Sequence, residues 1–145
     1  MRKLRGYILV TLQLACLGVI ALTGPLFPAL LPARLVLFAA VFVGLWAVLS
    51  MGVGRFQITP SVHRSGRSYR AGPYRFVRHP MYLALLVAIL ATVLSELSAI
   101  RLAAWLSLVV VLVQKLRLEE RLLTERYPEY ASYVSSTRRL LPFVY

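Results

Sequence analysis

The sequence places two adjacent carboxylates, Glu119 and Glu120, where its last long apolar run meets a basic segment. Ionisable groups at the edge of a membrane span are functional candidates by default, and one or both could point into a polar site that holds a cation. The alternative is solvation and pairing with Lys115 or Arg117, including an i,i+4 contact between Lys115 and Glu119. Such pairing is worth little at a surface. The spacing alone leaves both interpretations open.

A second polar cluster reads GPYRFVRHPMY at residues 72–82 and lies directly before another apolar run. Pro80 suits the first turn of a helix, where its missing N–H costs nothing, so His79 could merely precede a helix. The arginines could merely anchor a membrane span. Neither interpretation explains the two tyrosines, or Gly72-Pro73, which predicts a tight turn.

The remaining composition excludes several classes of site. The chain has no aspartate, its two histidines, His63 and His79, have no partners at metal-ligand spacing, and no glycine-rich phosphate loop is present. A metal-dependent hydrolase, a soluble nucleotide-binding fold and a Ser-His-Asp enzyme are therefore disfavoured. The single cysteine, Cys16, rules out an internal disulfide. We expect no bound metal.

The elements that must position these residues are membrane helices. The chain is 59% hydrophobic over 145 residues, whereas soluble proteins are about 45–50% apolar. We expect an all-α integral membrane protein with about four transmembrane helices. The apolar runs that predict them are Tyr7–Thr23, Ala33–Val53, Met81–Leu97 and Ile100–Gln114.

The distribution of charge predicts the orientation. The net charge is +12, and of the 17 Lys and Arg residues all but Arg34 and Arg101 fall on one side of the predicted spans. The positive-inside rule then places both termini and the middle loop in the cytoplasm. Basic residues spread in this way favour anionic lipid head groups over nucleic acid. We expect an integral protein of a bacterial or archaeal inner membrane, with its active site facing the cytoplasm.

We expect a single membrane domain over residues 1–145. It divides into an N-terminal hairpin at 1–54, a basic cytoplasmic loop at 55–79, a C-terminal hairpin at 80–116 and a cytoplasmic helical tail at 117–145. From Lys115 the chain reads as a helix that leaves the membrane with one apolar face. Pro128 either breaks this helix or begins a second short one. The apolar, aromatic end of the tail is typical of a segment lying against the membrane interface.

The block GPYRFVRHPMY, two spans with a short turn, and then EERLLTERYPEYASY and LLP together resemble the isoprenylcysteine carboxyl methyltransferase family. The phospholipid methyltransferases share the C-terminal half of that family. The resemblance covers about half of the chain, from Tyr69 to Pro142. It implies an integral-membrane methyltransferase that uses S-adenosylmethionine, with the cofactor bound at the cytoplasmic side.

The resemblance also implies which residues form the site. It places the following in the cofactor pocket: Tyr69, Tyr74, His79, Pro80, Met81, Tyr82, Glu119 and Glu120. It places Lys115 or Arg117 near the methyl acceptor, as catalytic residues that position it. The chain departs from the family pattern at Tyr69-Arg70-Ala71, where hydrophobic or threonine residues are usual, and at Tyr127-Pro128, where Phe-Gly is usual.

The chemistry of the cofactor agrees with these positions. Glu119 or Glu120 can accept a charge-assisted hydrogen bond from the α-ammonium of S-adenosylmethionine, and His79 or Arg75 can meet its carboxylate. Of the two glutamates we favour Glu119, which lies nearer the span. The rings of Tyr74 and Tyr82 can pack on the adenine or face the sulfonium. A carboxylate or thiolate acceptor needs no general base, whereas an amine would need one.

We therefore predict methyl transfer from S-adenosylmethionine to a lipidic or small amphipathic acceptor. One alternative is an NADPH-dependent enzyme similar to the sterol reductases, which share the Arg-His-Pro-x-Tyr block but have more spans and a different C-terminal motif. Another is a non-catalytic membrane scaffold that retains an inactive pocket. The short spans could pair in an oligomer to seal the site.

Overall fold

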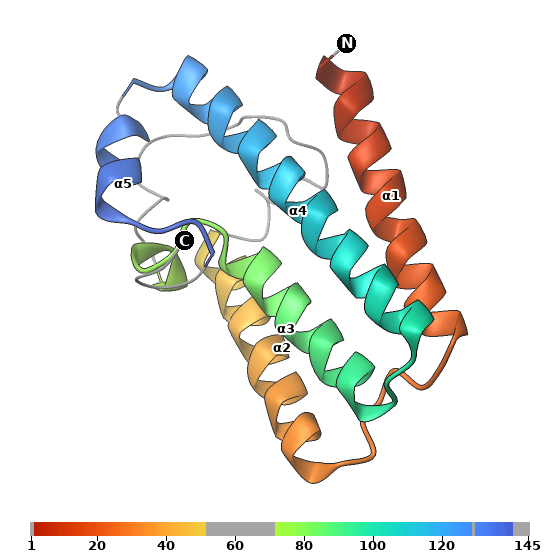
Figure 1. Cartoon of the computed structure of the whole chain (residues 1–145). Helices are drawn as coiled ribbons and strands as arrows, with labels where there is room; N and C mark the ends of the chain where they lie inside the picture. Colours follow the sequence, from red (N-terminus) through yellow and green to blue (C-terminus); the bar gives the residue numbers. More distant parts are fainter. Residues whose placement is uncertain (1, 52–71, 129, 141–145) are drawn as a thin grey trace.

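The computed structural model describes residues 2–51, 72–128 and 130–140, in which helices are joined by short turns and there is no β-strand (Figure 1). The predicted all-α class is thus confirmed for the described part of the chain. Its elements are α1 (Arg2–Leu22), α2 (Leu31–Met51), the 3-10 helix η3 (Gly72–Arg75), α3 (Pro80–Ser95), α4 (Ala99–Arg126) and α5 (Tyr130–Ser136).

Three of these helices contain segments long and apolar enough to cross a membrane: Leu4–Leu22, Leu31–Ser50 and Ala99–Arg126. The third predicted span, α3, has only 16 residues, or about 24 Å at 1.5 Å per residue, against roughly 30 Å of hydrocarbon. It is therefore a shorter apolar helix. By contrast, α4 has 28 residues and continues without a break through Lys115 and both glutamates, as predicted.

The helix boundaries follow from particular residues. Gly24 lies in the turn that follows α1, and Pro32 occupies the first turn of α2, where a proline costs no hydrogen bond. Pro80 is the first residue of α3. Ser98 caps α4, because its Oγ accepts a hydrogen bond from the backbone N–H of Arg101 at 3.2 Å. α4 ends at Arg126, two residues before Pro128, as the first alternative for that proline predicts, and the second short helix, α5, begins at Tyr130.

The long helices pack chiefly in two pairs. α1 runs antiparallel to α4, α2 runs antiparallel to α3, and a smaller contact joins α3 to α4 (Figure 1). The shared core consists of Leu86 on α3 and of Leu108 and Leu112 on α4, with Cys16 and Leu17 of α1 packed against them. This arrangement brings α1 beside the half of α4 that carries Lys115.

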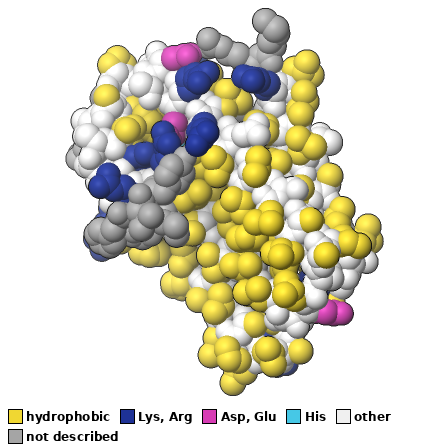
Figure 2. All heavy atoms as spheres, viewed as in Figure 1, with side chains coloured by type: hydrophobic (Ala, Val, Ile, Leu, Met, Phe, Trp, Pro, Cys, Tyr) yellow, Lys and Arg dark blue, Asp and Glu magenta, His cyan; other side chains and the backbone are white. Residues whose placement is uncertain are grey.

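Large apolar side chains cover much of the surface (Figure 2). On α2 alone the exposed ones are Leu31, Leu35, Val36, Phe38, Val41, Phe42, Leu45, Trp46 and Leu49. Monomeric soluble proteins rarely expose contiguous apolar surface on this scale, because water penalises it. In the view of Figure 2 the Lys and Arg side chains gather above this surface, over the end of the molecule where α4 finishes. The fold is that of an integral membrane protein.

Arg34 and Arg101, the two basic residues that lie away from the basic end of the molecule, hold the connection between α1 and α2 in place. Arg34 donates to the carbonyl oxygens of Pro28 at 2.8 Å and Ala29 at 2.6 Å. Arg101 is fully buried and donates from Nη2 to the carbonyl oxygen of Pro25 at 2.9 Å. Both guanidinium groups thus satisfy carbonyls of the connection between α1 and α2. These two exceptions to the charge bias have a structural role.

Gly72 begins η3 in a conformation that favours glycine, with φ of +54°. A Cβ at this position would collide with the side chain of Ser50 at the end of α2 and lie 3.2 Å from Trp46 Nε1. We expect Gly72→Ala to lower the free energy of unfolding by about 2 kcal/mol or more, since the backbone conformation alone costs about 1–2 kcal/mol. Thermal unfolding in detergent measures this loss.

Gly18→Ala is the matched control for that change. Gly18 lies within α1, and nothing lies within 4 Å of the Cβ that alanine would add. Alanine is the better helix former, so Gly18→Ala should leave the unfolding temperature unchanged or raise it. Equal destabilisation by both substitutions would contradict the close approach of Gly72 to α2.

Candidate functional site

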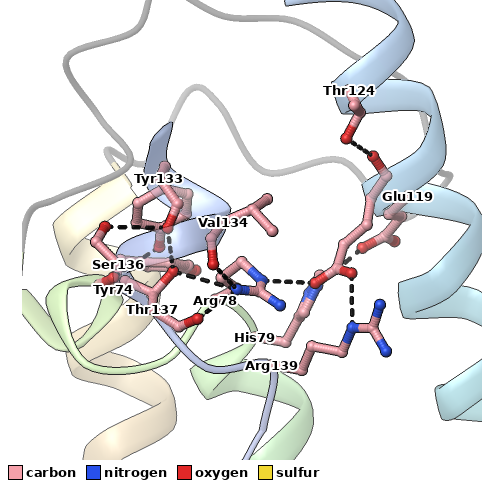
Figure 3. A network of polar contacts seen from close by, with 11 residues as sticks. Tyr74, Arg78, His79, Glu119, Thr124, Tyr133, Val134, Ser136, Thr137 and Arg139 are labelled. Atoms are coloured by element: carbon pink, nitrogen blue, oxygen red, sulfur yellow. Dashed lines mark hydrogen bonds and ion pairs between the residues drawn. The ribbon is translucent and has the colours of Figure 1, made fainter. Parts of the chain in front are cut away.

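The site forms where the start of α3, the second half of α4 and the segment after α5 meet (Figure 3). The chain just before α3 runs parallel to the C-terminal segment and forms one bridge, between Val77 and Arg138. The backbone N–H groups of Arg78 and His79 donate to the carbonyl oxygens of Arg138 at 2.7 Å and Arg139 at 3.0 Å. The described part of the predicted tail therefore folds back onto the residues that precede α3.

Glu120 joins these three segments through its side chain. Its Oε1 accepts from Arg78 Nε at 2.7 Å, and its Oε2 accepts from Arg139 Nε at 2.8 Å. Arg78 also donates from Nη1 to the carbonyl oxygens of Val134 at 2.9 Å and Thr137 at 2.5 Å (Figure 3). Because the Glu120 side chain is only 9% exposed and both its oxygens have charged partners, it holds the site together.

His79 precedes α3 directly, and its side chain lies among the polar residues of the candidate site. Its backbone is the N-cap of α3 and its side chain makes no capping hydrogen bond, while Pro80 is fully buried at the first helical position. The imidazole instead lies between the two glutamates, with Nδ1 3.8 Å from Glu119 Oε2 and Nε2 3.3 Å from Glu120 Oε1. That shorter contact is not aligned as a hydrogen bond, so the buried Nε2 has no hydrogen-bond partner among the described residues.

Glu119 is less engaged than its neighbour. Its Oε1 accepts from the hydroxyl of Tyr82 at 2.5 Å, and the Tyr82 ring stacks on the His79 ring with centroids 5.5 Å apart. Its Oε2 lies beyond hydrogen-bond distance of His79. The side chain is 22% exposed, more than twice the exposure of Glu120. Glu119 therefore retains an acceptor oxygen that a ligand could use.

Lys115 points toward α1. Its Nζ donates to Gln13 Oε1 at 3.1 Å and lies 5.3 Å from the centre of the Tyr82 ring. The i,i+4 contact with Glu119 is not an ion pair, because no salt bridge between the two is found among the described residues. Lys115 is buried, whereas Arg117, its alternative near the acceptor, is exposed.

Other predicted residues lie around this centre. Tyr74 is buried in η3, and its carbonyl oxygen accepts from the Tyr133 hydroxyl at 2.6 Å. Burial, with smaller contributions from Tyr133 and Glu119, raises the pKa of the Tyr74 hydroxyl above its usual range. Met81 is half-buried at the start of α3. Arg75 is exposed, 4.4 Å from the Phe76 ring centre. The predicted Tyr69 lies outside the described residues.

Three residues of the site were missed at the level of sequence. Arg78 resembled a membrane anchor, Arg139 belonged to a tail assigned to the interface, and Gln13 lay within an apolar run. The available signals were the position of Arg78 directly before His79 and the isolated amide of Gln13. Within the described ranges no group of His, Cys, Asp and Glu residues could hold a metal ion.

Comparison with known proteins identifies one related family. The family model described as phospholipid methyltransferase matches residues 27–130. No curated protein and no solved structure matches the chain. The matched range begins in the turn before α2 and ends at the first residue of α5. It therefore includes His79, Tyr82, Lys115 and both glutamates, and it leaves α1 outside.

Proposed function

The chain belongs to the phospholipid methyltransferase family, and from that premise we propose that it transfers a methyl group from S-adenosylmethionine to a lipidic or small amphipathic acceptor. The observation that carries the proposal is the Glu119 carboxylate, which is partly exposed and has an oxygen beyond hydrogen-bond distance of its neighbours. It lies in the C-terminal half of α4, beside the aromatic pair of His79 and Tyr82. A cationic ligand fits such a site.

The donor and acceptor chemistry of these residues suits the cofactor. Glu119 would accept from the α-ammonium group, and the Tyr82 hydroxyl, which donates to Oε1, orients the carboxylate so that Oε2 remains for the ligand. His79 and Tyr74 would line the same site. Glu120 would act through Arg78, Arg139 and His79, because its oxygens are already occupied. When bound, the cofactor supplies an activated methyl group.

The protein has to bring the acceptor into line with that methyl group and to exclude water. Lys115, which is buried and donates to Gln13 of α1, would position an acceptor that arrives from the lipid. Arg117 would act from the exposed side of the same helix. The apolar surface of α1 and α2 lets an acceptor keep its hydrophobic chain in the bilayer.

We propose that the site faces the cytoplasm of a bacterial or archaeal inner membrane, because the basic residues gather at that end of the molecule. In a Cys16→Ser background, a cysteine at exposed Ser135 should react with an impermeant maleimide only in opened cells, and one at exposed Leu26 should react in intact cells. The reverse pattern would contradict this orientation.

The rival enzymatic function is reduction with NADPH, and the non-enzymatic rival is a scaffold with an inactive site. Calorimetry of the purified protein in detergent separates them. We expect S-adenosylhomocysteine to bind and NADPH not to bind, since a carboxylate placed for an ammonium group repels phosphates. Binding of NADPH alone would favour the reductase, and binding of neither would favour the scaffold.

A further inference from the structure

Lys115 is a buried cation in an unusual position. The residue is only 4% exposed and lies within a helix long enough to span the membrane. It makes no ion pair with any carboxylate among the described residues. Of the two glutamates near it, Glu119 accepts a hydrogen bond from Tyr82, and Glu120 forms ion pairs with two arginines. An ionisable group at this depth is costly unless it is paired or functional. An anion is the partner that it lacks.

Gln13 supplies a second donor beside Lys115. Its Oε1 accepts from the ammonium group at 3.1 Å, and its amide N–H₂ makes no hydrogen bond to the described residues. Since a lysine has three N–H donors, and Lys115 directs one to Gln13, two groups with unused donors lie together at the contact of α1 with α4. Gln13 is only half-buried, so a ligand can reach the pair past its side chain.

His79 and Arg75 are poorly placed to meet the carboxylate of the cofactor. His79 lies between two glutamate side chains, so a third carboxylate there would meet charges of its own sign. Arg75 is exposed and lies against the Phe76 ring. By contrast, Lys115 precedes Glu119 by one helical turn, which separates their Cβ atoms by about 5–6 Å. An amino-acid head could therefore reach both.

We propose that Gln13 and Lys115 form a binding site for an oxyanion carried by a ligand of this enzyme. The oxyanion is either the carboxylate of the methyl donor or the phosphate or carboxylate of the acceptor's head group. The inference deepens the proposed function and rests on it. It also assigns a role in ligand selection to α1, which lies outside the residues matched by the family model.

The test is Gln13→Glu, which places a carboxylate beside Lys115 and supplies from within the protein the anion that the ligand would bring. Thr11→Glu is the matched control, because it adds the same charge at an exposed position of α1. Calorimetry of both variants and the wild type in a neutral detergent uses five probes: S-adenosylhomocysteine, its decarboxylated analogue, dodecyl phosphate, dodecanoate and uncharged dodecanol.

Gln13→Glu should weaken the binding of the oxyanion ligand at least about tenfold, the loss expected for one charge-assisted hydrogen bond. If the cofactor brings the oxyanion, S-adenosylhomocysteine loses affinity and its decarboxylated analogue does not. If the acceptor brings it, dodecyl phosphate or dodecanoate loses affinity while S-adenosylhomocysteine and dodecanol do not. Thr11→Glu should change none of these affinities. Either pattern supports the oxyanion site.

Equal affinities of the wild type and Gln13→Glu for every probe would overturn the inference and leave the pair as a link between α1 and α4. Should Gln13→Glu fail to fold, Gln13→Met removes the amide at similar size and should weaken the same probe several-fold, and unchanged binding there would be equally decisive. Failure of S-adenosylhomocysteine to bind the wild type would contradict the proposed function. The dodecyl probes would still report on the oxyanion site.

Discussion

Replacing Glu120 by glutamine should lower the free energy of unfolding by about 3 kcal/mol, the largest stability effect that we expect from a conservative change. The carboxylate is buried and engages Arg78 at 2.7 Å and Arg139 at 2.8 Å. Removing its charge leaves the buried guanidinium of Arg78 without a counter-ion, and breaking a buried pair in this way costs about 3–5 kcal/mol. The amide oxygen of glutamine can replace one hydrogen bond, which sets our value at the lower end.

Unfolding in detergent, followed by circular dichroism, measures this loss. Glu125→Gln is the matched control, because it removes the same charge from an exposed position on the same helix, and it should cost less than about 0.5 kcal/mol. Arg139→Gln should cost less than Glu120→Gln, since the Arg139 side chain is 36% exposed and water can replace part of its interaction. If Glu120→Gln were as mild as the control, Glu120 would not hold the C-terminal segment to α3 and α4.

Replacing Glu119 by glutamine should instead weaken the binding of S-adenosylhomocysteine by about ten- to a hundredfold. This is the loss of one charge-assisted hydrogen bond, about 1.5–3 kcal/mol, from the α-ammonium of the ligand. The stability of the protein without ligand should change by less than about 1 kcal/mol, because glutamine still accepts from the Tyr82 hydroxyl. Titration calorimetry measures the affinity, and thermal unfolding measures the stability.

The contrast between the two neighbours makes the assignment falsifiable. Adjacent helical residues point about 100° apart. Glu119 can therefore face the ligand while Glu120 joins α4 to the segment before α3 and to the C-terminal segment. We expect the binding defect in Glu119→Gln and the stability defect in Glu120→Gln. Unchanged affinity in both variants would remove the cofactor role from this pair, and a binding defect confined to Glu120→Gln would reverse the assignment.

The helices themselves could be predicted from sequence. Runs of apolar residues predicted spans at 7–23 and 33–53, and the structure has α1 at Arg2–Leu22 and α2 at Leu31–Met51. The continuation of the helix past Lys115 was also predicted, and a break at Pro128 was one of the two predicted alternatives. Apolar length and helix-breaking residues are local properties, so they can be read without knowledge of the partners.

The pairing of the helices could not be predicted. In lipid a helix is apolar on nearly every side, so its sequence has no polar face to show where its neighbour lies. Side chains of α1 and α3 pack around Leu108 and Leu112 of α4, and α2 packs against α3. Gln13 was overlooked for the same reason, because its importance depends on its being opposite Lys115.

The sequence predicts which residues form the centre of the site, but it does not predict the separate role of each one. His79, Tyr82 and the two glutamates are brought together as expected. The preference for Glu119 over Glu120 as a ligand-binding group stays a prediction, and it gains support from the exposure of the two side chains. The role of Arg78 and Arg139 depends on the packing of the C-terminal segment against residues 77–79. This contact joins residues about 60 positions apart, so no local sequence pattern predicts it.

We infer that this membrane protein uses its glutamate site for methyl transfer. The most direct measurement reconstitutes the purified chain in vesicles of phosphatidylethanolamine and phosphatidylglycerol, adds S-adenosylmethionine with a tritiated methyl group and a set of amphiphiles that carry carboxylate, thiol or amine heads, and counts the label extracted into organic solvent. We predict enzyme-dependent transfer to at least one of these lipids or amphiphiles, and its near loss in Glu119→Gln but not in Glu125→Gln. No transfer above background to any acceptor, from protein that binds S-adenosylhomocysteine, would contradict the claim.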